Sequence, residues 1–550
     1  MSNPGSPPGP HEDHTDQGER ADQTRPLPPP PPPPSAAGPA ADEQPPRRRR
    51  ALTIGVLAAV VVLLVPGAVF AWRALDGGGP QPHDVLPADS IGYFRIDMDP
   101  SAAQKVEAFR FLRKFPGFSD ATGITEEDDD LRELLVDQFS AATGCDLDFS
   151  TDIEPWLGHR VGGAVLPPAG DGESPGFALA LQADDEDAAR ETFDTAQDCG
   201  GAEERVGLSY ADGYLLITDT QDNADAYAES AQDSSLADND EFAESMDLLG
   251  DPGIASFWVS GTAMFDTFGA ALGNTQAFPG DESGSLVDES REMIEDSYRS
   301  FAATFRFDDS YAELATVTTG DIYEETNADG VQADVPDDTS VLVGVSGGGD
   351  ALLNNWDSIV ESYPGAEEQI ATLESQTGFT LPDDLATLLG DSLLLAMDGT
   401  DLDLQVLTRG DLSALNAGVK VDTDADAFGE IWAGIQDIAA QAGQSLEGLP
   451  VEETDDGYIA AFNDEYAATL REGGTLADAD VYSTAVRDAA DADAVFFVNF
   501  DSFEDTVLDA LADYGFDEQT LESIRTLEAL GVSGRTYDGH AEITMRVSVD

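Results

Sequence analysis

One serine in the chain stands in a sequence pattern that hydrolases use. Residues 344–348, GVSGG, fit the pattern G-x-S-x-G between an expected strand and an expected helix, where a nucleophile elbow would hold Ser346. A serine hydrolase also needs a histidine base, and His540 is the only histidine that follows Ser346 in the chain. A glycine turn before a helix capped by Asp350 explains the same residues without catalysis. Hydrolysis is therefore kept only as an alternative.

Three aspartates imitate the start of a calcium-binding loop. Asp422, Asp424 and Asp426 have the spacing of the first EF-hand ligands. Ala427 stands where that loop needs glycine, and Ala433 stands where it needs glutamate. The chain also lacks a paired histidine or cysteine motif at zinc spacing, a phosphate loop and a dinucleotide fingerprint. We therefore expect no catalytic residue, no metal site and no cofactor, and we expect that the chain is not an enzyme.

Four basic residues gather on one expected helix. Lys105, Arg110, Arg113 and Lys114 lie within ten positions of each other, although basic residues are rare in the rest of the body. Such a patch could contact anionic headgroups, a cell-wall polymer or an acidic partner. It could equally pair with the chain's own carboxylates and with the C-terminus of its helix. The patch is a candidate contact site, and both interpretations stay open.

The chain has two cysteines, Cys145 and Cys199. A location outside the cytoplasm would permit a disulfide between them. Two free buried thiols are the other interpretation, because spacing alone does not show that the two residues are close. We treat the pair as a possible disulfide.

The charge of the chain excludes one class of partner. Asp and Glu total 109 against 26 Lys and Arg, so the formal net charge at pH 7 is −83. Such a chain repels nucleic acid. A salt-adapted or generally acidic proteome would explain the acidity, and specific cation capture is the alternative. Because 41% of the residues are hydrophobic, we expect the body to bury a core despite its charge.

An apolar stretch divides the sequence. Residues 51–72 contain no charged residue, four arginines at 47–50 precede them, and Arg73 follows. As a helix they would span about 33 Å, close to the thickness of a bilayer core. The sequence thus predicts a transmembrane helix over 51–73 with a cytoplasmic N-terminus. A cleaved signal peptide and a buried core helix are the alternatives. Residues 1–50 are expected to be a disordered, proline-rich cytoplasmic arm, and residues 74–85 a linker.

The body beyond this stretch contains an internal repeat. Short motifs recur in the same order: residues 363–365 (YPG) repeat 115–117 (FPG), and residues 456–458 (DGY) repeat 212–214. Strand-like runs and helix-like runs recur between these motifs. The predicted fold class is α+β: a single transmembrane helix, then two tandem, similar domains of antiparallel sheet and helices, at 86–325 and 334–550. In this alignment Asp97 is the counterpart of Ser346, so the two repeats do not share the serine motif.

The start of the body resembles a known family. Residues 86–117, LPADSIGYFRIDMDPSAAQKVEAFRFLRKFPG, combine a strand, an Asp-Pro turn and a helix that ends in FPG. With the proline-rich arm and the apolar stretch before it, this segment is similar to the DUF3352 family of bacterial, mainly actinobacterial, membrane proteins. The resemblance covers most of residues 86–550. Since the family has no assigned activity, the resemblance implies a topology and a compartment but no mechanism.

These observations lead to an expected function. We expect a membrane-anchored, extracytoplasmic binding or interaction protein of the cell envelope. Its expected partners are the lipid bilayer, through residues 51–73, and an envelope protein, polymer or lipid ligand. One alternative is an envelope serine hydrolase using Ser346, which requires His540 within hydrogen-bond reach. The other is a carrier of lipid or another apolar ligand, which requires a continuous apolar cavity. An interaction module requires an exposed apolar or charged groove.

Overall fold

The structure of the chain is a computed structural model. It describes residues 80–98, 102–119, 130, 132–133, 136, 147–168, 175–199, 205–261, 297–325, 328–361, 365–400, 412–441 and 450–550. All of these residues belong to the second of two units, residues 51–550. The arm expected at 1–50 and the helix expected at 51–73 lie outside the described residues.

The described helices do not fit a membrane-spanning role. The longest of them, α14 (Ala425–Gln441), has 17 residues, which is about 26 Å of helix against a bilayer core of about 30 Å. Within the described ranges, no helix combines the length and the hydropathy that crossing a bilayer requires. This finding contradicts the predicted single-pass topology, with its transmembrane helix at 51–73, cytoplasmic N-terminus and cell-membrane location. We withdraw those predictions.

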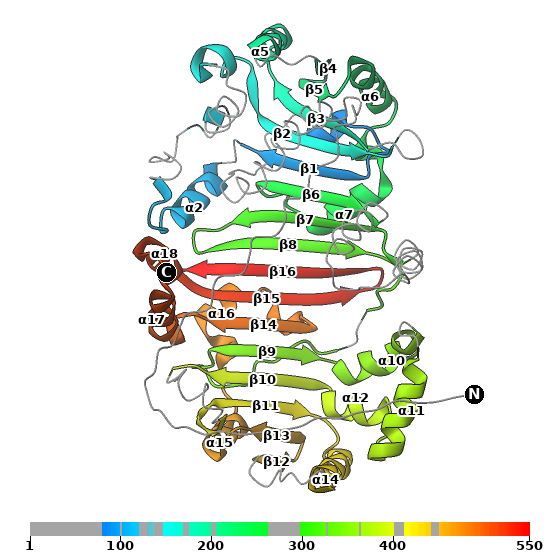
Figure 1. Ribbon diagram of the computed structural model, residues 1–550, viewed down its shortest axis with the longest axis vertical. Helices are drawn as coiled ribbons and strands as arrows, with labels where there is room; N and C mark the ends of the chain where they lie inside the picture. The colour runs from blue at the N-terminus through cyan, green and yellow to red at the C-terminus, as the bar shows by residue number, and fades with distance from the viewer. Residues whose placement is uncertain are drawn as a thin grey trace, which may run out of the picture. The chain divides into compact units, whose positions relative to one another are not determined.

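In the described part of the chain, sixteen strands form one antiparallel sheet (Figure 1). The strands before residue 320 are β1 Gly92–Asp97, β2 Leu157–Leu166, β3 Gly176–Ala183, β4 Gly207–Ala211, β5 Tyr214–Thr218, β6 Ala255–Ser260, β7 Ser300–Phe307 and β8 Tyr311–Thr319. The strands after residue 340 are β9 Val341–Ser346, β10 Ser392–Asp398, β11 Asn416–Asp422, β12 Val451–Thr454, β13 Gly457–Ala461, β14 Ala494–Asn499, β15 Leu527–Tyr537 and β16 His540–Val549. Successive residues of each strand point to opposite faces of this sheet.

The strand order repeats from one half of the sheet to the other. From one edge it reads β4-β5-β3-β2-β1-β6-β7-β8, and from the other edge β12-β13-β11-β10-β9-β14-β15-β16. The halves meet where β8 pairs with β16, from Tyr311 opposite Ser548 to Thr319 opposite His540. Figure 1 shows β16 (red) directly beside β8 (green). The two predicted repeats, 86–325 and 334–550, therefore share one sheet. An unpaired β8 or β16 would leave an open edge, which this pairing removes. The predicted α+β class is confirmed.

Helices connect the strands in both halves. In the first half they are α2 Ala102–Leu112, α5 Glu186–Cys199, α6 Gln221–Asp233 and α7 Asp240–Leu249. In the second half, besides α14, they are α10 Gly348–Glu361, α11 Ala366–Thr377, α12 Asp383–Leu389, α15 Asp464–Glu472, α16 Asp480–Ala485, α17 Glu504–Tyr514 and α18 Glu518–Arg525. Polar side chains start several of them: the side chains of Thr220, Asn239 and Asn463 accept hydrogen bonds from backbone N–H groups in the first turns of α6, α7 and α15.

Helices cover one face of the sheet in both halves. In the first half, α6 and α7 pack on Tyr214, Leu216 and Trp258 of the sheet. In the second half, α15 and α16 pack on Ile459 and Phe497. We call this side the helix-covered face. One hydrophobic core of each half lies between these helices and the sheet.

The last residues expected in the linker are part of the fold. Pro82–Val85 form a short 3-10 helix, and Val85 is buried. The ring of His83 lies 5.3 Å from the ring of Phe242, and Tyr214 donates a hydrogen bond from its hydroxyl to the carbonyl oxygen of Pro80 at 2.9 Å. The described chain therefore begins on the helix-covered face.

Candidate functional site

The structure separates the two residues that a hydrolase would need. Ser346 ends β9 and is buried, with an exposed fraction of 7%. His540 begins β16, and β14 and β15 lie between these two strands. Three strand spacings of about 4.8 Å place the residues roughly 14 Å apart along the sheet, far beyond a hydrogen bond. His540 instead stacks on Tyr537, with ring centroids 4.7 Å apart. The arrangement does not form a serine–histidine pair.

The counterpart of Ser346 in the first half has a structural environment of its own. Asp97 ends β1 and is buried. Its Oδ2 lies 2.7 Å from Nη2 of Arg95 and 3.2 Å from Nε of Arg160. Arg95 also donates from Nε to Oε1 of Gln81 at 3.1 Å. These contacts hold the segment before β1 against the helix-covered face.

The three aspartates with EF-hand spacing lie at the end of β11 and at the start of α14. Asp424 accepts a hydrogen bond at Oδ1 from the backbone N–H of Ala427 at 2.9 Å, at the start of α14. Asp422 belongs to β11 and Asp426 to the first turn of α14. Among the described residues, no group of three or more His, Cys, Asp or Glu side chains is placed to hold a metal ion.

The structure describes one of the two cysteines of the predicted disulfide. Cys199, the last residue of α5, is disulfide-bonded. Cys145 lies outside the described residues, so its part in the bond stays a prediction.

The face of the sheet opposite to the helix-covered face carries a continuous row of apolar side chains. Residues that lie opposite each other in neighbouring antiparallel strands point to the same face. One such row crosses ten neighbouring strands, from β2 to β10. In order, its members are Val161, Ile96, Ala255, Phe305, Leu314, Met545, Val532, Phe496, Val343 and Leu395. Nine spacings of about 4.8 Å make it roughly 43 Å long.

Three more rows on this face have the same character. The next row along the strands contains Gly163, Phe94, Phe257, Ala303, Thr316, Ile543, Gly534, Ala494, Val345 and Leu393. The third row lies on one side of these two and contains Val165, Gly92, Val259, Phe301, Thr318, Ala541 and Thr536. The fourth row lies on the other side and contains Phe307, Ala312, Val547, Leu530, Val498, Val341 and Met397. We call these four rows the apolar sheet face. No member is charged, in a chain with 109 acidic residues.

The apolar sheet face is partly open to solvent. Every large hydrophobic residue that is exposed in a described strand belongs to it: Val165 37%, Phe257 43%, Leu395 40%, Phe496 36%, Ile543 50% and Met545 36%. Soluble proteins expose contiguous apolar patches of more than a few hundred Å² mainly where something binds. The exposure therefore indicates a binding surface.

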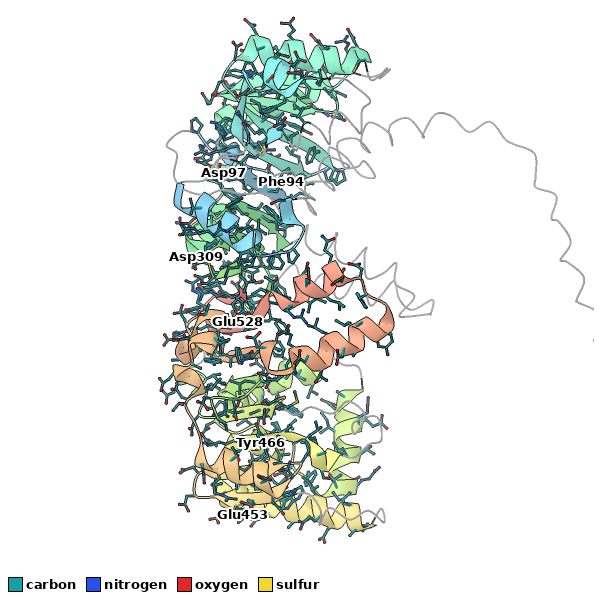
Figure 2. The ribbon with its side chains drawn as sticks, turned by 90° about the vertical axis from the view of Figure 1, so that its left-hand side faces the viewer. Phe94, Asp97, Asp309, Glu453, Tyr466 and Glu528 are labelled. Carbon is teal, nitrogen blue, oxygen red and sulfur yellow. The ribbon has the colours of Figure 1, made fainter. Side chains whose placement is uncertain are left out.

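The helices that the structure describes lie at the margins of this face. At the outer side of the first half, Trp156, just before β2, and Ala189 of α5 belong to one cluster with Val161 and Ile96. At the outer side of the second half, Phe428 of α14 packs near Leu393. At the strand ends of the centre, α2 packs on Phe305, Phe307 and Ala312. Figure 2 shows α17 and α18 projecting from the sheet as a pair.

The apolar sheet face offers few polar contacts to a ligand. The backbone N–H and C=O groups of its strands point along the sheet toward neighbouring strands, because each of the ten strands pairs on both sides. The rows contain three polar side chains, the hydroxyls of Thr316, Thr318 and Thr536. The surface suits a ligand part that needs no hydrogen bonds.

The predicted basic patch lies on the helix beside this face. Arg110 is exposed on α2 and Arg113 is exposed in the turn after it, where its guanidinium lies 5.8 Å from the ring centroid of Phe109. Lys114 donates a hydrogen bond from Nζ to the carbonyl oxygen of Val549 at 3.0 Å. The side chain of Lys105 lies outside the described residues. None of these three cations lies within 4.0 Å of a described carboxylate, and both interpretations of the patch stay predictions.

Glu107, three residues before Arg110 on α2, has two acidic neighbours. Burial raises the pKa of Glu107, and the charges of Asp308 and Asp309 raise it further, while Arg110 opposes the shift. Asp309, beside α2, is labelled in Figure 2. The end of α2 thus has cations on its exposed side and acidic neighbours toward β7 and β8.

Comparison with known proteins agrees with the resemblance seen in the sequence. Residues 55–400 match the family described as "Protein of unknown function (DUF3352)". The chain, an α+β protein built on one antiparallel sheet, belongs to this family. The description of the family gives no evidence of enzymatic activity.

Two further comparisons add no function. No curated protein matches the chain. The solved structure titled "Structure of crystal form III of TP0453" is 7% identical, and the alignment covers 46% of this chain and 83% of that one with a TM-score of 0.22. A similarity this low supports no conclusion about this chain.

The sequence contains a signal for the apolar sheet face, namely strands that are apolar on both sides. Strands such as β10 (SLLLAMD) and β14 (AVFFVN) are apolar at nearly every position. A strand with only one buried face alternates apolar and polar residues, whereas a run of apolar residues indicates that both faces meet apolar surroundings. Because helices cover one face, the apolar residues on the other face indicate a candidate binding site.

Proposed function

We propose that this chain is a non-enzymatic binding protein that holds the hydrocarbon part of a lipid-like ligand on its apolar sheet face. The observation that carries the proposal is the set of four uncharged rows, two of which cross ten strands, partly exposed in a chain of net charge −83. This proposal develops the carrier alternative and keeps the expectation of a binding protein without catalysis.

The chemistry of the surface favours a hydrocarbon over a peptide. An extended peptide brings backbone N–H and C=O groups that would lose water without gaining partners on this face. A hydrocarbon chain has no such groups. Covering about 500 Å² of apolar surface contributes about 12 kcal/mol, and an association cost of about 4 kcal/mol or more leaves micromolar affinity at best.

The binding test uses the full purified chain after lipid removal. A fluorescent sixteen-carbon fatty acid is titrated into the wild type, and unlabelled palmitate is used to displace it. We expect saturable binding that Phe496→Asp or Met545→Asp weakens at least about tenfold, because the new carboxylate would lose water beneath the ligand. Tyr514→Asp is the matched control, since Tyr514, the last residue of α17, is 86% exposed and belongs to none of the four rows.

The outcomes distinguish the ligand from other occupants. A folded wild type that binds no hydrocarbon probe overturns the proposal, as does a folded Phe496→Asp variant with wild-type affinity. Native mass spectrometry of the same samples reports a second copy of the chain. A dimer that Phe496→Asp dissociates, with no probe bound to the monomer, would mean that the face serves self-association instead.

A further inference from the structure

Arg110 of α2, and Arg113 and Lys114 directly after α2, differ from the other basic residues. Every other lysine or arginine whose side chain the structure describes lies within 4.0 Å of a carboxylate. These paired residues are Arg95, Arg132, Arg160, Arg190, Arg205, Arg299, Arg306, Lys420, Arg471, Arg487, Arg525, Arg535 and Arg546. With 109 acidic residues available, pairing is the ordinary state of a cation here. Three cations at the end of α2 that have no carboxylate partner in the described part of the chain therefore form a local exception.

The exception lies at the border of the apolar sheet face. The inner side of α2 packs on this face, and the ring of Phe111 lies 5.3 Å from the ring of Phe307 in the outermost row. Arg110 is exposed on the same helix, whose diameter is about 10 Å, and Arg113 is exposed in the turn that follows it. A ligand that lies on the rows and reaches past α2 would meet these cations.

We propose that Arg110 and Arg113, assisted by Lys114, bind the oxyanion headgroup of an amphiphile whose hydrocarbon lies on the apolar sheet face. This inference rests on the proposed function. A guanidinium offers paired N–H donors that match a carboxylate or a phosphate ester. Lys114 is a compact cation whose carbonyl contact to Val549 uses one of its three donors.

The position of the acidic neighbours agrees with a headgroup on the exposed side. Asp308 and Asp309 are close enough to Glu107 to raise its pKa, so negative charge gathers on the β7–β8 side of α2. An anion approaching from that side is repelled, whereas the exposed side presents Arg110 and Arg113. The remaining surface of the chain, at net charge −83, repels anions generally.

The experiment compares two ligands of equal chain length, palmitate and uncharged hexadecanol. Both compete with the fluorescent fatty acid on the wild type and on an Arg110→Gln/Arg113→Gln variant of the full chain. We expect the wild type to prefer palmitate by about fivefold, and the variant to lose most of that preference while keeping its affinity for hexadecanol. The matched control is Arg205→Gln/Arg525→Gln, because both of those arginines are exposed but ion-paired.

Each result has a separate meaning. If the wild type binds neither palmitate nor hexadecanol, the proposed function itself fails. If both bind and the double variant keeps the wild-type preference, the headgroup inference is wrong although the proposed function stands. A third arm adds inorganic phosphate, and displacement of palmitate by phosphate alone at equal concentration would show a site for free anions, which also contradicts the inference.

Discussion

Arg546 donates a hydrogen bond from Nε to Oε2 of Glu313 at 2.9 Å, across the strand pair that joins the two halves of the sheet. Glu313 is buried, with an exposed fraction of 3%, and Arg306 reaches its other oxygen at 2.9 Å. Arg487, from the segment after α16, lies 3.6 Å away. One carboxylate thus holds cations from both halves at their junction.

Removal of that carboxylate should weaken the junction. Glu313→Gln leaves the guanidiniums without a counter-charge, and removal of one partner from a buried pair costs about 3–5 kcal/mol. We expect a clearly lower urea midpoint than for the wild type. Glu229→Gln, at an exposed position of α6, is the control and should change stability by no more than about 0.5 kcal/mol. Equal midpoints for Glu313→Gln and the control would contradict the role of Glu313.

Two adjacent phenylalanines of β14 should respond differently to truncation. Phe497 is fully buried on the helix-covered face, and its ring lies 5.1 Å from that of Tyr482, whereas Phe496 is 36% exposed on the apolar sheet face. We expect Phe497→Ala to cost about 3–5 kcal/mol in unfolding free energy. Phe496→Ala should cost far less and should instead reduce binding of the fatty-acid probe. Similar losses of stability in both variants would show that both faces are equally packed.

Two glycines of β15 provide a second comparison of the faces. An added Cβ at Gly531 would meet the carbonyl oxygen of Ala485 at 2.2 Å, but at Gly534 its nearest neighbour is 3.8 Å away. We expect Gly531→Ala to destabilise the chain by about 1–3 kcal/mol, because α16 must move. Gly534→Ala should be neutral or slightly stabilising, since glycine disfavours a strand interior. Thermal unfolding of the two variants measures the difference, and a clear loss at Gly534 would mean that this part of the apolar sheet face is covered.

Asp501 should make stability depend on pH. Burial, followed by the charges of Asp550, Glu528 and Glu504, raises its pKa from 3.8 to about 6. Because the folded pKa exceeds the unfolded one, the favourable contribution is present below about pH 4 and is lost as the pH rises through 6. We expect Asp501→Asn to be more stable than the wild type at pH 7 to 8, by up to about 1 kcal/mol at this largely exposed position.

The measurement for Asp501 is the urea midpoint of both proteins across this pH range. The gain of Asp501→Asn should shrink as the pH falls and should vanish near pH 4, where the aspartate is protonated in both states. A gain that stays constant from pH 4 to pH 8 would exclude titration of Asp501 as its cause.

Local patterns predicted much of the secondary structure. Residues 91–98 read as a strand and contain β1, and the run that ends at Phe115-Pro116-Gly117 read as a helix and contains α2. The recurring motif at 212–214 stands at the turn between β4 and β5, where Ala211 pairs with Tyr214. These features depend on neighbours within a few positions of the chain, namely turn residues, caps and periodicity, which the sequence shows directly.

The sequence by itself also determined the apolar runs of strands such as β10 and β14, the concentration of basic residues between 105 and 114, and the membership in the family. Only the tertiary structure decided that the repeats share one sheet, because β8 and β16 pair across more than 220 positions of the chain. It likewise decided which apolar side of each strand receives helices and which stays open. Finally, it showed that Arg110 and Arg113 lack carboxylate partners among the described residues, whereas Arg546 has one in Glu313. The physical reason is common to all three: strand pairing, burial and ion pairing are long-range contacts, and spacing along the chain does not specify them.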